Sequence, residues 1–381
     1  MKIEFFRHNI GKEEIAKVTE VLDSIFLTTG DTVSEFEEKF SRYLGCKYTI
    51  GTTSCTAALH LSLLAHGVGQ GDEVITSPMS FIATANTILH TGAKPVFTDV
   101  EPDTGNMNAE LIEHVITEKT KAILPVHLYG QMCDMKKIKD IADRHGLVII
   151  EDAAHCIEGQ RDGIKPAQLS EAACFSFYAT KNITSGEGGA IATNNTKIAD
   201  LLKRLRLHGM TKGAAARYSQ KYQHYDMDLL GWKYNMNNIQ AALLLNQLDL
   251  IENRWERRVE ISRMYEDALS NIEGINYPKV LPKSKSARHL FTMWVDPKMR
   301  DEILWALQDR GIGVAVNFRP IHLMKYYREN FGYEKGMFPV AEKMGKSTIS
   351  LPLYPKLTND QVLYITENLK EIMTSLETKQ K

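Results

Sequence analysis

The sequence predicts an α/β protein in which a large domain with a mostly parallel β-sheet is followed by a smaller α+β domain. From about residue 45 to residue 195, short β-branched runs alternate with amphipathic segments of helical length, and this alternation is typical of βαβ units. The chain has 381 residues, more than the roughly 250 to 300 at which a single hydrophobic core stops growing. We therefore place a large domain at residues 1–245, with the N-terminal segment included, and a small domain at residues 246–381.

The first half of the chain supplies the repeating units of the predicted sheet. Strands are expected at residues 72–78, 94–100, 121–130 and 146–155. Between them, apolar residues recur at i, i+3 and i+4, which predicts helices at residues 55–68, 81–93 and 135–146. Ligands of such sheets bind beyond the carboxyl ends of the strands. Side chains that follow a strand are therefore the first candidates for a site.

The second half of the chain is less regular. Residues 235–272 carry apolar residues at helical spacing without Pro or Gly, which predicts a long helix, with at most one break, between the two domains. Beyond it we expect a strand at 289–296, a helix and then a strand within 301–318, and a closing helix at 358–373. Residues 212–228 are polar and poorly periodic, as is typical of an exposed loop.

Composition argues against several classes of partner. The 46 basic and 47 acidic residues leave a formal charge of -1, so nothing favours nucleic acid or an anionic membrane. Five scattered cysteines without a CxxC pair suggest neither disulfides nor a metal site. The N-terminus lacks the apolar core of a signal peptide, and no apolar run is long enough to span a bilayer. We expect a soluble, cytoplasmic protein.

Three features fall at predicted strand ends. Thr56 and its neighbours precede a helix, where N–H groups and a hydroxyl suit a phosphate, although a plain N-cap is the alternative. Glu151 and Asp152 end an apolar strand, and Asp152 is either an N-cap or an acid that pairs with a protonated ring nitrogen. Lys181 stands between an apolar run and a Gly-rich turn. A lysine there is either solvated or a nucleophile.

A phosphate site, a partner for a pyridinium and an amine nucleophile at one rim together specify pyridoxal 5′-phosphate, whose aldehyde forms a Schiff base with lysine. The segments that carry a family resemblance include "TTGDTVSEFEEKF", "PVHLYGQMCDM", "IIEDAAH", "SFYATKNITSGEGGAI", "GWKYNMNNIQAALLLNQL" and "SLPLYP". Over essentially its whole length the sequence resembles the DegT/DnrJ/EryC1/StrS family of pyridoxal-phosphate-dependent sugar aminotransferases. The resemblance implies fold type I, with a seven-stranded sheet in the large domain.

The resemblance also implies roles for individual positions. Lys181 takes the place of the lysine that binds the cofactor aldehyde, Asp152 that of the acid on the pyridine nitrogen, and His155 a place beside the cofactor's 3′-oxygen. The remaining implied cofactor contacts are Phe81 stacked on the ring, Thr56, the Ala57 backbone and Ser176 at the phosphate, and Asn235 reaching the phosphate from a neighbouring subunit. A homodimer with two shared active sites follows from that last contact.

In this family the amino donor is usually L-glutamate and the acceptor a nucleotide-linked keto sugar. The resemblance implies that Lys181 moves protons in both half-reactions. Some members carry histidine in place of this lysine and act as sugar dehydratases; the lysine here favours transamination. The product would be an amino sugar for a surface polysaccharide, a glycan or an antibiotic.

The substrate is indicated less directly. The segment "NFRPIHLMKYYRENF" is similar to members that act on UDP-linked 4-keto sugars. Arg319 and His322 would then line the sugar-nucleotide pocket, or else belong to a basic surface loop. Arg217 would grip the diphosphate across the dimer interface, or else be solvated. We expect amination at C4 of a UDP- or dTDP-linked 4-keto-6-deoxyhexose or a UDP-linked 4-keto-pentose, with a 3-keto sugar as the nearest alternative.

Overall fold

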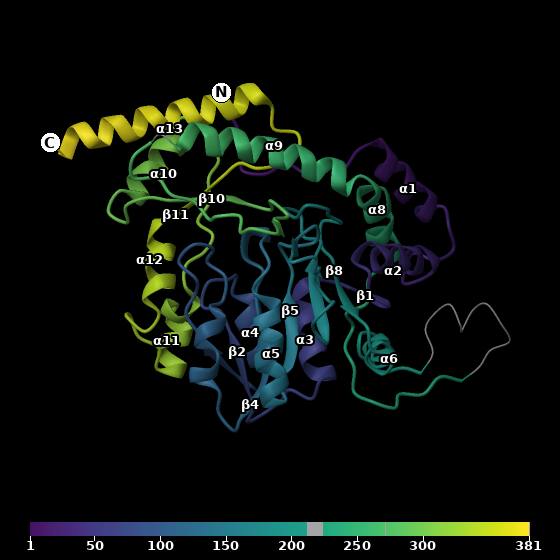
Figure 1. Ribbon diagram of the computed structural model, residues 1–381. Coiled ribbons are helices and arrows are strands. Elements are labelled where there is room, and N and C mark those ends of the chain that lie inside the picture. Colours follow the sequence, from purple (N-terminus) through teal and green to yellow (C-terminus); the bar gives the residue numbers. More distant parts are fainter. Residues whose placement is uncertain (212–223, 271, 381) are drawn as a thin grey trace.

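A seven-stranded sheet forms the centre of the larger part of the molecule (Figure 1). The structure is a computed structural model and describes residues 1–211, 224–270 and 272–380. Only β8 runs against the other six strands, so the α/β fold class with a mostly parallel sheet is confirmed. Across the sheet the order is β1 (Tyr48–Thr52), β8 (Gly189–Thr193), β7 (Ala172–Ser176), β5 (Val148–Asp152), β4 (Thr120–Leu124), β2 (Glu73–Thr76) and β3 (Lys94–Phe97).

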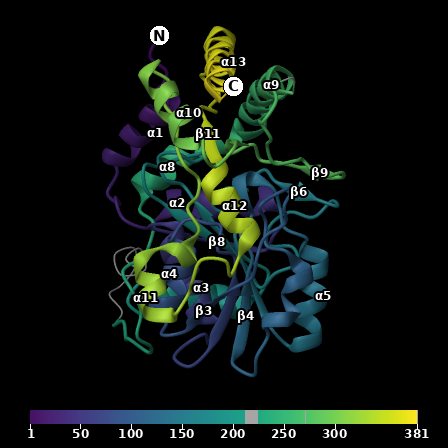
Figure 2. The same ribbon diagram turned by 90° about the vertical axis from the view of Figure 1, so that its left-hand side faces the viewer.

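Helices cover both faces of this sheet (Figures 1 and 2). Side chains alternate along each strand, so that in β7 Ala173 and Phe175 enter one core and Ala172 and Cys174 the other. Because both faces are buried, the strands are apolar throughout rather than alternating with polar residues. One face packs on α2 (Asp31–Leu44), α5 (Met135–His145) and α8 (Asn238–Asp249), the other on α3 (Cys55–Ala65), α4 (Ala83–His90) and α6 (Thr196–Leu205).

The predicted elements of the first half are confirmed within their expected ranges, except that β4 begins one residue before its range and ends at Leu124, so that residues 125–130 are not strand. The long helix expected after residue 235 is also confirmed, with its single break at Leu250: α8 ends at Asp249, and α9 (Ile251–Leu269) follows at once. The N-terminal helix α1 (Lys12–Leu22) packs against α8.

A second core lies in the C-terminal part of the chain. There β10 (Phe291–Trp294) pairs antiparallel with β11 (Thr348–Leu351). Helices α9, α10 (Arg300–Asp309) and α13 (Asn359–Gln380) enclose the apolar side chains of this pair. Ile3, from the other end of the sequence, is buried in the same core. The domain division at residues 245 and 246 stays a prediction.

The strand expected within residues 311–318 is not formed. This segment makes only the isolated bridges Ile3↔Ile312 and Ala315↔Ser350. The carbonyl of Asn317 accepts hydrogen bonds from the hydroxyls of Tyr129 (2.5 Å) and Thr348 (3.2 Å). The segment therefore touches β11 only at isolated points and forms no continuous ladder with it, so the strand prediction was wrong here.

The remaining short elements join these two parts. Helices α11 (Lys325–Phe331) and α12 (Pro339–Ser347) lie beside the outer strand β3 of the large sheet (Figure 2). The hydroxyl of Tyr333 donates to the carbonyl of Pro95 in that strand, at 2.7 Å. The others are β6 (Gln160–Arg161) paired with β9 (Ser284–Lys285), and the 3-10 turns η1 (Ala109–Leu111), η2 (Glu113–Val115), η3 (Leu128–Gly130) and η4 (Ile321–Leu323).

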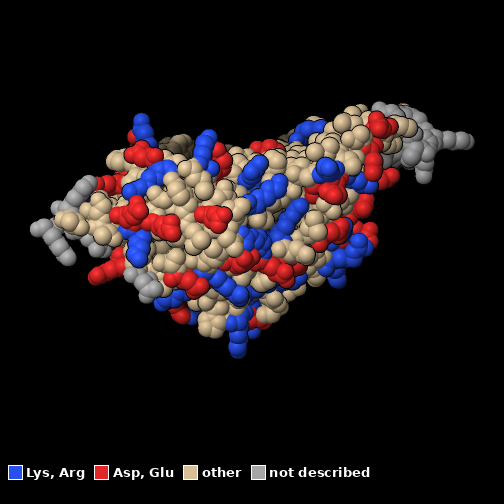
Figure 3. All heavy atoms as spheres, turned by 90° about the horizontal axis from the view of Figure 1, so that it is seen from above, with Lys and Arg blue, Asp and Glu red and all other residues tan. Residues whose placement is uncertain are grey.

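On the face drawn in Figure 3, Lys and Arg side chains are interspersed with Asp and Glu. That face therefore carries no broad field of one sign. Among the helices that the structure describes, none is long and apolar enough to cross a membrane.

Candidate active site

A cavity of about 650 Å³ opens beyond the carboxyl ends of the parallel strands. Its floor comes from the large sheet and from the N-terminus of α3, and its roof from the C-terminal part of the chain. Binding at this edge is the rule for parallel sheets, because the connecting loops and helix N-termini gather there. The lining includes Ser54, Cys55, Thr56, Phe81, Thr84, Asp152, His155, Ser176, Lys181, His289, Asn317 and Phe318, together with Phe5 and Phe6.

Asp152 is the last residue of β5 and is buried at the bottom of the cavity. Its Oδ2 accepts a hydrogen bond from the Thr84 hydroxyl at 2.8 Å, and its Oδ1 accepts from the Ala154 N–H at 3.1 Å. Burial raises the pKa of the carboxyl, although these two bonds and the charge of Lys181 oppose the rise. A cation or a charged N–H in the cavity would therefore bind this carboxylate favourably.

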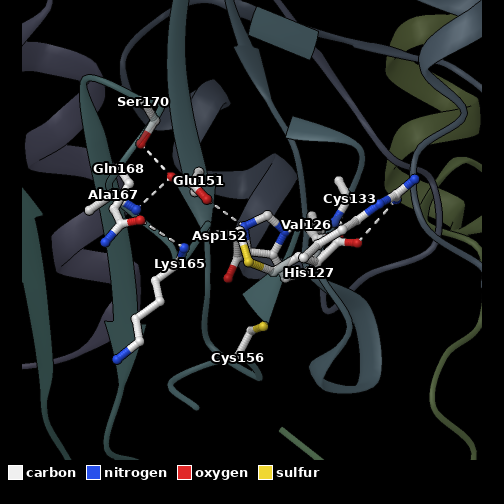
Figure 4. A network of polar contacts seen from close by, with 12 residues as sticks. Val126, His127, Cys133, Glu151, Asp152, Cys156, Lys165, Ala167, Gln168 and Ser170 are labelled. Atoms are coloured by element: carbon white, nitrogen blue, oxygen red, sulfur yellow. Dashed lines mark hydrogen bonds and ion pairs between the residues drawn. The ribbon is translucent and has the colours of Figure 1, made fainter. Parts of the chain in front are cut away.

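The residue before it, Glu151, points to the other side of the strand and anchors it (Figure 4). Its carboxylate is paired with the ring Nε2 of His127 at 2.5 Å. It also accepts hydrogen bonds from the Ala167 N–H (2.7 Å) and the Ser170 hydroxyl. The fully buried ring of His127 accepts from the Cys133 N–H at 3.2 Å. This network fixes the end of β5, and with it the position of Asp152.

Lys181 lies in the connection between β7 and β8, as its position in the sequence predicted. Its N–H closes a turn onto the Tyr178 carbonyl at 2.9 Å. The connection is held from beneath because Gln247 of α8 donates to the carbonyl of Thr184 at 2.7 Å. Burial of the amine lowers its pKa to about 8, against the opposing electrostatic effects of Cys55 and Asp152. An amine with that pKa is partly unprotonated near neutral pH, which a nucleophile requires.

The N-terminus of α3 opens into the same cavity. Ser54 caps the helix by accepting from the Ala57 N–H at 3.1 Å, and Thr56, two residues further on, is exposed at the cavity. Strand β8 comes close beneath this turn: a Cβ at Gly189 would lie 2.4 Å from the carbonyl carbon of Ser54. The free N–H groups and the helix dipole favour an anion here.

Aromatic rings form the opposite wall. Phe81 is 59% exposed at the cavity and lies near Phe318, with ring centroids 6.3 Å apart. His155 stacks on Phe318 at 5.8 Å and an interplanar angle of 14°. The ring of His289 lies 4.4 Å from that of His155. Ser176, at the end of β7, is buried below them and accepts from the Tyr178 N–H at 3.4 Å.

The structure brings together Thr56, Phe81, Asp152, His155, Ser176 and Lys181, all of which line the cavity. It places the other predicted residues elsewhere. Ala57 is buried behind Ser54, and Asn235 bonds to Thr29 (2.6 Å) and Lys233 (2.6 Å) outside the lining.

The substrate residues predicted in the C-terminal part also lie outside the lining. His322 is fully buried, pairs with Glu342 at 3.2 Å and does not reach the cavity, so the structure does not place it beside a sugar nucleotide. Arg319 is exposed next to the lining residue Phe318. Arg217 lies outside the described residues.

Sequence reasoning missed the cavity residues that come from distant parts of the chain. His289 and Asn317 lie within segments that were interpreted only as secondary structure, and Phe5 and Phe6 come from the extreme N-terminus. The only signal in the sequence was a lone histidine directly before the apolar run of β10. Such a residue is as typical of a core position as of a site.

A buried amine, a buried carboxylate and a helix N-terminus that share one cavity in an α/β fold define an enzyme active site. The chain matches the DegT/DnrJ/EryC1/StrS aminotransferase family over residues 8–370 and belongs to that family. It is therefore an aminotransferase of fold type I.

Named relatives span almost the whole chain. The spore coat polysaccharide biosynthesis protein SpsC of Bacillus subtilis is 44% identical over 370 residues, which are 96% of this chain and 95% of SpsC. A putative sugar aminotransferase of Streptococcus pneumoniae, solved in its PMP form, has a TM-score of 0.93 and 32% identity and covers 98% of this chain and 100% of its own. Helicobacter pylori PseC, an aminotransferase in pseudoaminic acid biosynthesis, has a TM-score of 0.92 and 30% identity, with 98% and 100% covered.

Proposed function

We propose that the protein uses pyridoxal 5′-phosphate to transfer the amino group of L-glutamate to a nucleotide-linked keto sugar. The observation that carries this proposal is that Lys181, Asp152 and the N-terminus of α3 line one cavity, in which burial lowers the pKa of the Lys181 amine. The relatives support it, since the S. pneumoniae sugar aminotransferase is known in PLP and PMP forms.

The cavity residues fit the cofactor group by group. The N-terminus of α3, with Thr56 and Ser176, offers N–H and hydroxyl donors for a phosphate. Asp152 offers a buried carboxylate for a protonated ring nitrogen, and burial without such a partner raises its pKa. Phe81 offers an exposed aromatic face for the ring.

When bound, pyridoxal phosphate supplies an aldehyde for amine exchange and a ring that withdraws electrons from the reacting carbon. Lys181 then has two tasks. Its unprotonated Nζ would hold the cofactor through the aldehyde group, and once freed the same Nζ would take up and give back the proton that amino transfer moves. Asp152, whose carboxylate is fixed by Thr84 and Ala154, would favour the protonated form of the ring nitrogen.

We infer amination at C4 of a UDP- or dTDP-linked 4-keto-6-deoxyhexose or 4-keto-pentose, with a 3-keto sugar as the competing acceptor. The product would feed a surface polysaccharide, a glycan or an antibiotic. SpsC, named for spore coat polysaccharide biosynthesis, supports the first of these. Lys181 disfavours a sugar dehydratase on this scaffold, since the lysine is the group that transamination requires. Arg319, exposed beside the cavity, is proposed as a contact of the nucleotide diphosphate.

We further propose a cytoplasmic homodimer in which Asn235 reaches the phosphate of the partner's site. Asn235 does not line the cavity of its own subunit. Around it the surface carries exposed apolar side chains on neighbouring segments, with Ile25 92%, Leu27 44% and Leu230 75% exposed. Exposed apolar clusters of this kind mark protein interfaces.

A mixed-dimer experiment tests the shared site. Lys181→Ala and Asn235→Ala are each expected to be inactive, whereas unfolding and refolding them together restores one native site in each mixed dimer, about a quarter of all sites. Light scattering measures the oligomeric state. A monomer, or a mixture that stays inactive while each variant remains folded, would contradict the shared site.

The activity itself is tested with the purified protein, L-glutamate and a panel of UDP- and dTDP-linked keto sugars. Mass spectrometry and NMR identify the aminated product and its carbon. The visible absorption of the bound cofactor should fall when L-glutamate is added and return with the correct keto sugar. If L-glutamate leaves the spectrum unchanged and no sugar is aminated, the proposal fails.

A further inference from the structure

His289 is a histidine of the cavity to which neither the family resemblance nor the proposed function gives a task. It immediately precedes Leu290 and strand β10, so it enters the cavity from the C-terminal part of the chain. The side chain is buried, and its Nδ1 lies 3.0 Å from Oδ1 of Asn182, next to Lys181 in the sequence.

The orientation of the Asn182 amide decides where the proton of His289 sits. The amide nitrogen of Asn182 donates to Oε2 of Glu158 at 2.8 Å and to the Ala287 carbonyl at 3.1 Å. Both partners are acceptors, so the amide oxygen must face the ring. It follows that Nδ1 of His289 carries a hydrogen and donates it to Asn182.

The network behind Asn182 makes this orientation rigid. Glu158 is fully buried and forms an ion pair with Arg258, which is also fully buried. Because this carboxylate is paired with a guanidinium, it is ionised and can only accept hydrogen bonds. The chain of contacts from Arg258 through Glu158 and Asn182 therefore holds the ring of His289 in one tautomer.

The ring carries a single proton. Burial lowers the pKa of His289 well below its ordinary value, and the charges of Lys181 and Arg258 lower it further. With Nδ1 protonated, Nε2 is left with a lone pair. Within the described residues Nε2 has no hydrogen-bond partner, and the residue lines the cavity. The cavity thus contains a fixed hydrogen-bond acceptor.

His155 presents the opposite polarity. Its Nδ1 accepts a hydrogen bond from the Tyr129 N–H at 3.3 Å, and burial lowers its pKa well below the ordinary value. The single proton of this ring must then lie on Nε2. Two rings whose centroids are 4.4 Å apart therefore offer the cavity one donor and one acceptor.

We propose that Nε2 of His289 accepts a hydrogen bond from a hydroxyl group of the sugar substrate and so selects for its presence. This inference rests on the proposed function. L-Glutamate is the less suitable partner, because its carboxylates are acceptors only and a neighbouring lone pair repels them. A sugar hydroxyl supplies the missing donor, and a site built around it rejects an analogue that lacks it.

The test is a cycle that combines variants of His289 with substrates that lack one hydroxyl. His289→Phe keeps a flat ring but removes the acceptor, and we expect kcat/KM for the keto sugar to fall roughly 10- to 100-fold. With the native protein, one single-deoxy analogue should show a similar fall in kcat/KM. With His289→Phe, the same analogue should have almost the same kcat/KM as the full sugar. The L-glutamate half-reaction, followed by cofactor absorption, should be preserved in both proteins.

Two further variants keep the result decisive. His289→Gln retains an acceptor and should recover part of the lost kcat/KM, and His289→Ala replaces the Phe variant if that protein does not fold. His114→Gln, at an exposed position in η2, is the matched control. The inference is overturned if removal of each hydroxyl lowers kcat/KM by the same factor in the native protein and in the variant. It is also overturned if the variant slows the L-glutamate half-reaction as much as the sugar half-reaction. Failure of the native protein to aminate any keto sugar would instead reject the proposed function.

Discussion

The amine of Lys181 should titrate far below the range of an ordinary lysine. Its surroundings lower the pKa from 10.5 to about 8, with burial as the main cause. At pH 7 an amine with a pKa of 10.5 is unprotonated in about 0.03% of molecules, and one with a pKa of 8 in about 9%. Burial therefore enriches the nucleophilic form about 300-fold, which is the amount of activation that the fold contributes before any cofactor binds.

Trace acylation of the cofactor-free protein measures this directly, because only the unprotonated amine reacts. Peptide mass spectrometry follows labelling of Lys181 from pH 6 to pH 11, with the exposed Lys119 as an internal reference for the reagent. Labelling of Lys181 should rise with pH through a midpoint near 8.

A charge substitution sharpens the test. The carboxylate of Asp152 favours the protonated amine and opposes the effect of burial. In Asp152→Asn that charge is absent, so the midpoint for Lys181 should move to lower pH. A midpoint at pH 10 or above in the native protein, or an upward shift in the variant, would refute the reasoning.

Three further predictions follow from the same structure. Asp152→Asn keeps the Thr84 contact but loses the charge, and should lower kcat/KM by roughly 100-fold or more in steady-state assays. Glu158→Gln leaves the buried Arg258 unpaired and should cost about 3 to 5 kcal/mol in urea denaturation, whereas a double change to apolar residues at both positions should cost less. In Gly189→Ala the added Cβ would lie 2.4 Å from the backbone at the start of α3, so the protein should lose bound cofactor on dialysis. The control is Gly69→Ala, whose added Cβ would lie 4.0 Å from its nearest neighbour, and this variant should retain the cofactor.

Local patterns were sufficient for much of the fold and for the residues on the strand ends. The strands and helices between residues 72 and 155 have continuous apolar runs or helical spacing, and each formed where it was expected. Asp152 and Lys181 were found because Asp152 ends a strand of the mostly parallel sheet and Lys181 lies in the connection after β7, and such ends converge at one edge. These inferences needed only neighbours in the sequence.

The C-terminal part was harder because its contacts are distant in sequence. The strand expected within residues 311–318 gave way to a segment held by Tyr129 and Thr348. His322 was expected at the substrate, yet it pairs with Glu342 in the interior, since a histidine in a short motif gives no indication of which side its ring will face.

By itself the sequence determined the α/β class, the family and the amine and acid that line the site, because those depend on periodicity and on residues at strand ends. Only the tertiary structure decided that His289 shares the cavity with Lys181, more than a hundred residues away, and that its ring is held in one tautomer. The reason is physical: the tautomer is set by Asn182, Glu158 and Arg258, which come together only after the chain has folded.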